Sequence, residues 1–179
     1  MRYRTLFGSV TAIVLGLTVA AGTGEAVNLQ AWDQQINGPG RFKVLAAFGK
    51  AAVLDTETQL VWEQSPNPFF LLNWFDAQTH CIRRTVGNRR GWRLPTAQEL
   101  ESLVDPSNIE GGVLLLPALP VGHPFSNVQL LYWSASTVAG DTGLAWLVPV
   151  DGRGAAPASK SEDLFHVWCV RGGRGVDPQ

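Results

Sequence analysis

Short segments in which apolar and polar side chains alternate occur along much of this chain, and they predict β-strands. In the first such segment Phe42, Val44 and Ala46 alternate with more polar or outward-facing neighbours. Short apolar runs at 51–54 and 60–62 predict two further strands close behind it. The first part of the fold is therefore expected to be a small sheet.

A different periodicity, typical of a helix, follows Asn73, whose side chain can cap the first turn. Asp76 lies in that first turn and Arg83 and Arg84 in the last, so each charge opposes the nearest end of the helix dipole. Gly87 can adopt the left-handed conformation that often ends a helix. The predicted buried face consists of Trp74, Ala77, Cys81 and Ile82.

A second helix is predicted from Thr96, because Thr96 and Glu99 have the spacing of a capping box. Leu100 and Leu103 are expected to face inward, and Asp105-Pro106 to end the helix. Arg93 lies just before this helix between two apolar residues, so it needs a partner if it is buried. Glu101 or Asp105 is the expected partner.

The remaining strands are predicted at 130–133, 144–150 and 165–170, with glycine-containing turns between them. Residues 111–127 are rich in Gly and Pro and predict an irregular excursion. Strands, then two helices, then strands again indicate an α+β domain, with two helices packed on short, mainly antiparallel strands.

The start of the chain has the layout of a secretory signal peptide. Arg2 and Arg4 precede an apolar run at 6–21, and small residues follow, so cleavage is expected between residues 21 and 26. A retained anchor helix is the alternative, although the run is shorter than the roughly 20 residues needed to span a bilayer. The expected location is the periplasm, the cell envelope or the exterior, with membrane contact only through the signal peptide.

This reading divides the chain into four parts. They are a signal peptide at 1–26, a lead-in segment at 27–40, one domain at 41–174 and a tail at 175–179. The net charge of −1 does not favour a nucleic-acid or membrane-surface binder.

The chain has only two cysteines, Cys81 and Cys169. In an exported protein, two cysteines are expected to form one disulfide. Two free thiols or a redox pair are the alternatives, but the CxxC spacing of many redox pairs is absent.

Five short motifs occur in a characteristic order. They are TQLVW at 58–62, Trp74 with Ala77 and Cys81, GWRLPT at 91–96 with Glu99-Leu100, YWS at 132–134 with Thr137, and VWCVRGG at 167–173. This series resembles the Lcl C-terminal domain family, a family of domains of unknown function numbered 1566. The stretch at 93–96 is also similar to the formylglycine-generating sulfatase-modifying-factor superfamily, a relative of the C-type-lectin-like fold.

The resemblance implies that the two cysteines are structurally paired. It also implies that the residues of the motifs have structural roles. These positions are Trp62, Trp74, Trp92, Arg93, Leu94, Pro95, Thr96, Glu99, Trp133 and Arg171. Trp146 and Trp168 are also expected in the core, whereas Trp32 in the lead-in is not.

The related superfamily includes an oxidase that works through reactive cysteines, which makes a formylglycine-generating type of oxidoreductase the alternative function. The three histidines, His80, His123 and His166, do not have metal-ligand spacing with one another or with other ligands. The calcium-binding triplet of sugar-binding C-type lectins is missing as well. We therefore expect no metal, no cofactor and no catalytic residue.

Two polar loops, at 138–143 and 152–161, are the expected binding surface, because recognition residues are often placed on loops. Asp141, Thr142, Arg153 and Lys160 are their candidate residues. Inert connections are the alternative.

Five arginines within eleven residues form a second candidate: Arg83, Arg84, Arg89, Arg90 and Arg93. Outside the cytoplasm such a cluster suits an anionic glycan, and Arg89 and Arg90 are its candidate binding residues. The expected function is an exported, non-catalytic recognition or adhesion module for a glycan or protein ligand, with no nucleic-acid partner. A structural accessory protein of the envelope is a third possibility.

Overall fold

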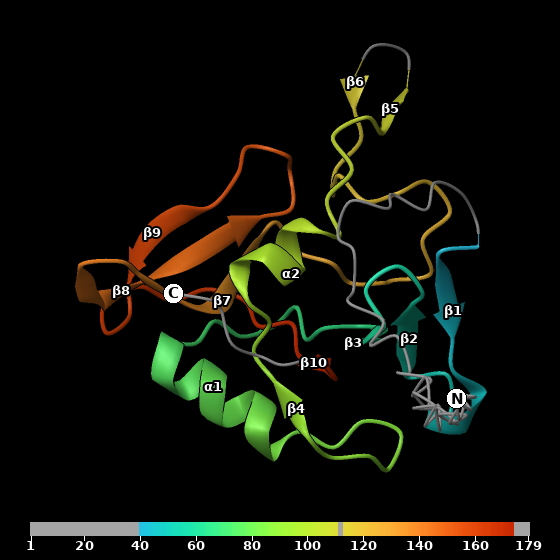
Figure 1. The fold of residues 1–179 in the computed structure, drawn as a ribbon, viewed down its shortest axis with the longest axis horizontal. Coiled ribbons are helices and arrows are strands. Elements are labelled where there is room, and N and C mark those ends of the chain that lie inside the picture. Colours follow the sequence, from blue (N-terminus) through green and yellow to red (C-terminus); the bar gives the residue numbers. More distant parts are fainter. Residues whose placement is uncertain (1–39, 111–112, 174–179) are drawn as a thin grey trace, which may run out of the picture.

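The computed structural model describes residues 40–110 and 113–173, and it shows the α+β arrangement expected from the sequence (Figure 1). The signal peptide, the lead-in apart from Gly40, Trp32 and the tail lie outside the described residues. The elements are β1 Phe42–Val44, a 3-10 helix Ala46–Phe48, β2 Ala52–Asp55, β3 Leu60–Glu63, α1 Trp74–Arg83, β4 Trp92–Arg93, α2 Ala97–Glu101, β5 Ile109–Glu110, β6 Val113–Leu114, β7 Leu131–Val138, β8 Asp141–Pro149, β9 Ala156–Ser159 and β10 Val170–Arg171.

The main sheet has five strands in the order β1-β2-β3-β10-β4, and all of its pairings are antiparallel. The last strand of the domain is therefore inserted between two strands from its first half. Val170 is paired with Trp62 on one side and with Arg93 on the other. The sheet can be completed only when residues from both ends of the domain have met.

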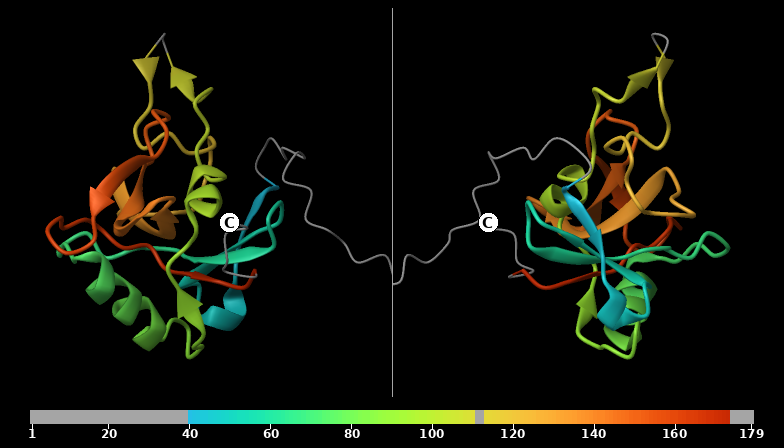
Figure 2. Two further views of the ribbon diagram at one scale, coloured as in Figure 1. Left: turned by 60° about the vertical axis from the view of Figure 1, so that its left-hand side comes forward. Right: turned by 90° about the vertical axis from the view of Figure 1, so that its right-hand side faces the viewer.

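A second antiparallel sheet, β7-β8-β9, packs beside the first, and the short β5–β6 hairpin projects from the body of the domain (Figure 2). Neither helix among the described residues is long and apolar enough to cross a membrane.

Helix α1 begins as predicted, since the Asn73 side chain accepts a hydrogen bond from the Asp76 amide at 2.9 Å. Two expectations about this helix are wrong. Ile82 is 66% exposed, because a step of about 100° per residue turns it away from the face that carries Cys81. The helix ends at Arg84 in an extended conformation. Gly87 instead serves a later tight turn, where a β-carbon would lie 2.4 Å from the Phe48 backbone.

Helix α2 carries the predicted capping box. The Thr96 hydroxyl accepts from the Glu99 amide at 3.1 Å, and the Glu99 carboxylate accepts from the Thr96 amide at 2.8 Å. Leu100 and Leu103 are buried as expected. The helix is shorter than predicted and ends at Glu101. After it the backbone forms i→i+3 hydrogen bonds, from Leu103 to Leu100 and from Val104 to Glu101, so the chain continues in tight turns.

Arg93 is paired with Glu99, so the expectation of Glu101 or Asp105 is wrong. The two nitrogens of its guanidinium donate to the two carboxylate oxygens at 2.6 and 2.7 Å, and one of them also donates to the Gly172 carbonyl at 2.7 Å. Glu99 is the nearer acid because its side chain bonds to the Thr96 amide at the start of α2, which directs the carboxylate toward β4. This one ion pair joins β4, α2 and the end of β10.

Three further expectations about secondary structure need correction. Ala46 starts a 3-10 helix instead of continuing β1. The segment 165–170 forms isolated bridges at Phe165 and His166 before its only regular strand, β10. The irregular excursion at 111–127 holds one short strand, β6, in its described part.

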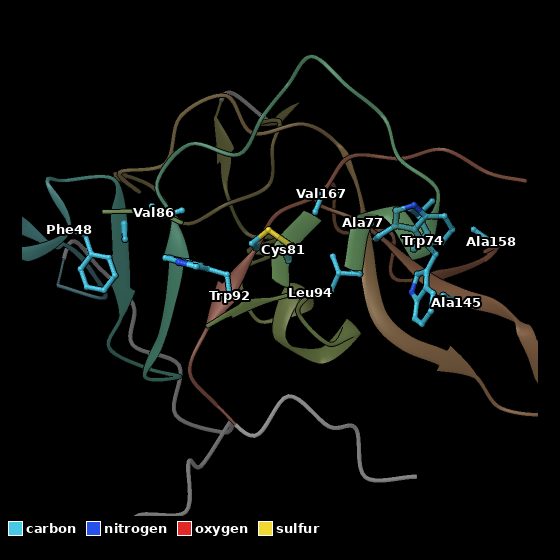
Figure 3. Close-up of a cluster of buried hydrophobic side chains, with 14 residues drawn as sticks. Phe48, Trp74, Ala77, Cys81, Val86, Trp92, Leu94, Ala145, Ala158 and Val167 are labelled. Atoms are coloured by element: carbon cyan, nitrogen blue, oxygen red, sulfur yellow. A yellow bond between two sulfur atoms is a disulfide. The ribbon is translucent and has the colours of Figure 1, made fainter. Parts of the chain in front are cut away.

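The predicted disulfide between Cys81 and Cys169 is confirmed, with an S–S distance of 2.04 Å across 88 residues of sequence. It links the buried face of α1 to the residue before β10, among the side chains of one of two hydrophobic clusters (Figure 3). The second cluster lies around Trp62, Tyr132 and Trp168. The cross-link therefore lies where the helix, the last strand and the core meet.

Replacing both cysteines with serine is expected to lower the free energy of unfolding by about 2–5 kcal/mol, because the reduced chain gains the entropy of an open loop. Urea denaturation of oxidised wild type and the double variant measures this difference. An unchanged midpoint would show that the cross-link contributes nothing to stability.

Arg93→Ala is expected to lower the free energy of unfolding by about 1–3 kcal/mol, since it leaves a buried carboxylate and a carbonyl without their donor. Arg93→Lys is expected to recover only part of the loss, because an ammonium cannot make the paired contact. Arg83→Ala, at an exposed arginine of α1, is the matched control and is expected to change little. Equal melting temperatures for Arg93→Ala and Arg83→Ala would contradict this account.

Candidate functional site

The candidate binding residues do not form one surface, because the structure places them in three separate regions. Asp141, Thr142 and Lys160 lie together where β7 turns into β8. Arg153 follows the opposite end of β8, which at 3.3 Å per residue is about 27 Å long. Arg89 and Arg90 lie on the connection between α1 and β4.

The two predicted binding loops are mostly regular structure, which corrects their assignment. Strand β7 continues to Val138 and β8 begins at Asp141, so only a two-residue turn remains between them. Strand β9 occupies the middle of the segment 152–161. The small and polar side chains of this segment hid its strand character, which depends on pairing with β8.

Lys160 is a structural residue and not part of an open binding surface. Its ammonium is buried, donates to the Thr137 hydroxyl at 2.8 Å and to the Thr142 carbonyl at 3.0 Å, and lies 4.1 Å from the centre of the Trp74 ring. Burial lowers the pKa of Lys160, and the nearby Asp141 acts in the opposite direction. The side chain fastens the β7–β8 turn to the first residue of α1.

Asp141, Thr142 and Arg153 are exposed, but two of them have local structural partners. The Asp141 carboxylate accepts from the Gly143 amide at 2.9 Å. Arg153 donates to Asp151 at 2.7 Å, and this hydrogen bond holds the pKa of Asp151 below its usual value. The charge of Arg153 is therefore paired, whereas among the described residues the carboxylate of Asp141 has only a neutral donor.

The arginine cluster is divided between scaffold and surface. Arg84 contacts Glu63 at 2.5 Å, and the other oxygen of Glu63 accepts from the Cys169 amide at 3.0 Å, so this pair supports the disulfide. Arg93 is bound to Glu99 as described above. Among the described residues, no carboxylate lies within 4.0 Å of the three other arginines, and these three are exposed: Arg83, Arg89 and Arg90.

A shallow, open depression of about 540 Å³ runs along α1 and includes Arg83 and Arg84 of this cluster. Its lining residues are Leu72, Asp76, Thr79, His80, Arg83, Arg84 and Thr85. The arginines and threonines offer hydrogen-bond donors, and Asp76 offers an acceptor toward the other end. Burial and the neighbouring Arg84 lower the pKa of His80, and Glu63 acts in the opposite direction.

Sequence reasoning missed this depression because it assigned Asp76 to the helix dipole and Arg83 to the dipole and the arginine cluster, without considering that the two share one face of the helix. The spacing of positions 76, 79 and 83 could have revealed it, since residues three, four and seven apart share one face of a helix.

Most of the motif residues are buried or make hydrogen bonds to the backbone. Side-chain nitrogens of four tryptophans donate to backbone carbonyls: Trp74 to Ser134 at 2.8 Å, Trp92 to Arg89 at 2.9 Å, Trp133 to Leu72 at 2.7 Å, and Trp168 to Glu63 at 2.9 Å. Trp62, Leu94, Pro95, Thr96 and Trp168 are buried, and half-buried Arg171 donates to the Arg90 carbonyl at 2.9 Å. Trp146 is only half-buried, contrary to expectation.

Within residues 40–110 and 113–173, no group of three potential ligands (His, Cys, Asp or Glu) is placed to hold a metal ion. Both cysteine sulfurs of the chain are bonded to each other.

Two histidines border the aromatic cluster. His123 stacks on Phe125 with ring centroids 5.9 Å apart, and His166 lies 6.2 Å from Tyr132. The Nδ1 atom of each imidazole is buried and has no hydrogen-bond partner among the described residues. Burial lowers the pKa of both His123 and His166.

The domain is therefore expected to lose stability in mild acid. Below the unfolded pKa of about 6.5 the unfolded chain binds more protons than the folded one, so the free energy of unfolding falls with the pH. Urea midpoints between about pH 7.5 and 5.5 measure the effect. A variant with both His123→Phe and His166→Phe should show a smaller fall, and an undiminished fall in that variant would contradict the assignment.

A comparison with known proteins places this fold in a family. No curated protein shows a significant match to the chain. The Lcl C-terminal domain family matches residues 51–171, from just before β2 to the end of β10. The matched range contains both bonded cysteines, the ion pair of Arg93 and the depression beside α1. This chain belongs to the Lcl C-terminal domain family.

Proposed function

We propose that this protein is an exported, non-catalytic recognition module, and that the exposed arginines beside α1 bind an anionic glycan. The location would be the periplasm, the cell envelope or the exterior. The apolar, small-residue leader at 1–26 and the single disulfide support export.

The observation that carries the proposal is the difference between paired and unpaired arginines. Arg84 and Arg93 are each held by a buried acid, whereas Arg83, Arg89 and Arg90 are exposed, and Arg83 also lines the open depression along α1. Guanidinium groups bind carboxylate and sulfate groups through two parallel hydrogen bonds. A hydroxyl group of a bound acidic sugar would donate a hydrogen bond to the Asp76 carboxylate and accept one from the Thr79 hydroxyl.

The shape of the site fits weak, repeated contacts. Exposed ion pairs contribute about 0.2–1 kcal/mol each, so one domain would bind a single acidic sugar weakly. Several domains on one polysaccharide, or several arginines along it, would give useful affinity. This is the behaviour expected of an adhesion module.

We further propose kinship with the C-type-lectin-like and sulfatase-modifying-factor folds. The stretch from Arg93 to Thr96, which leads from β4 into the capped helix α2, supports this relation. The bonded sulfurs support a binding role over the oxidase chemistry of that superfamily, which requires thiolates.

The glycan proposal is tested by salt elution of the chain from an immobilised sulfated polysaccharide. A variant with Arg83, Arg89 and Arg90 all changed to Gln is expected to elute at clearly lower salt, with about tenfold weaker affinity. Arg153→Gln, at an exposed arginine beyond the far end of β8, is the matched control and is expected to elute like wild type.

Three results would contradict the proposal. They are no retention of wild type, retention that does not depend on salt, and equal elution of the triple variant and the control. Titration of free thiols on unreduced protein is a separate check, in which two reactive thiols would favour the oxidase alternative.

A further inference from the structure

Four large apolar side chains lie exposed around the start of α1, at the opposite end of this helix from the arginines. Phe69 is 91% exposed, Leu71 48%, Phe75 57% and Leu164 52%. Single apolar side chains on a surface are common, but a group of this size at one place indicates an interaction site. We call these four residues the apolar corner.

Backbone contacts bring the members together although Leu164 is distant in sequence. Leu72 and Phe165 exchange two backbone hydrogen bonds of 3.0 and 3.1 Å, which places the neighbouring Leu71 and Leu164 on adjoining segments. The Trp74 amide donates to the Lys160 carbonyl at 3.1 Å. Figure 2 shows the chain before α1 and the segment near residue 160 side by side at one edge of the molecule.

The frame beneath the corner holds these side chains outward. The Leu72 carbonyl accepts from the Trp133 indole at 2.7 Å, and the Phe165 ring packs 5.2 Å from that of Trp133. The Phe69 amide donates to the Asn67 side chain at 2.8 Å, which fixes the loop ahead of the helix. The core below is already filled by buried tryptophans, so these four side chains cannot turn inward into it.

The charges around the corner are acidic. Asp76 and Glu162 are exposed and Asp163 is half-buried. The Asp163 carboxylate accepts from the Ser159 amide, and that of Asp76 from the Asn73 side chain, so both have neutral donors. The nearest lysine, Lys160, is buried and directed to Thr137. Among the described residues none of the three acids has a basic partner within 4.0 Å.

We propose that the apolar corner is a docking surface for a protein segment that presents apolar or aromatic side chains flanked by Lys or Arg. Burial of Phe69 and Phe75 would supply most of the affinity, and the acids would select a basic partner. An anionic lipid surface fits less well, because these acids would face its headgroups.

The four apolar side chains of this surface do not line the proposed glycan site, although Asp76 borders both. Phe75 and Arg83 are eight residues apart on α1, which corresponds to about 12 Å along the helix. One end of the exposed side of α1 is therefore apolar and acidic, and the other end is basic.

Random peptides of about a dozen residues, displayed on phage and selected on the immobilised protein, are the probe. The enriched peptides are expected to combine apolar or aromatic residues with Lys or Arg. For such a peptide, Phe69→Ser and Phe75→Ser are each expected to weaken binding about tenfold. Glu162→Gln is expected to weaken it severalfold at low salt only.

Ile82→Ser is the matched control, since Ile82 is exposed on the same helix two turns beyond Phe75. It is expected to bind the peptide like wild type. Circular dichroism checks that all variants are folded, as expected for exposed positions.

Several results would overturn the proposal. Enrichment of acidic or wholly polar peptides would contradict it. Equal binding of the peptide by Phe75→Ser and Ile82→Ser would also contradict it. Concentration-dependent dimerisation that Phe75→Ser abolishes would assign the corner to a second copy of the chain. Sedimentation with phosphatidylglycerol-containing vesicles that Phe69→Ser abolishes would assign it to a lipid surface.

Discussion

The disulfide between Cys81 and Cys169 joins two segments that are distant in sequence, and Glu63 beside it connects both to a third. Cys81 lies on the buried face of α1, and Cys169 precedes the strand that completes the main sheet. The buried Glu63 accepts from the Cys169 amide and from Arg84 at the end of the same helix. The covalent link and this ion pair together hold α1 against β3 and β10, and both proposed surfaces of α1 depend on that position.

Most of the buried charge has a structural partner. Arg41 is bound to Asp55, Arg93 to Glu99, and Lys160 to neutral oxygens above the Trp74 ring. A buried charge without such partners would destabilise the fold. Because these charged groups already have partners inside the protein, they are not free to bind a ligand. The charged residues that remain accessible then become informative about ligands.

Helix α1 would carry both of the proposed binding surfaces. Trp74, Ala77 and Cys81 are its buried residues, and the other side chains of the helix are exposed or half-buried. The basic end suits anions, whereas the apolar end suits a protein segment. A module with two such surfaces could link a glycan to a protein partner, which agrees with a role in adhesion.

The sequence by itself determined the local features: the two helix starts with their caps, the first three strands, the α+β class, the pairing of the two cysteines and the family. Each depends on residues close together in the chain or on a count, and Asn73 and the Thr96–Glu99 box are clear cases. Only the tertiary structure decided that Lys160 bonds to Thr137, that Arg93 reaches Gly172, that 156–159 is a strand, and that Leu72 pairs with Phe165. These features depend on contacts between residues far apart in sequence, and side-chain type alone does not specify which distant neighbour will fill the space or supply the hydrogen bond.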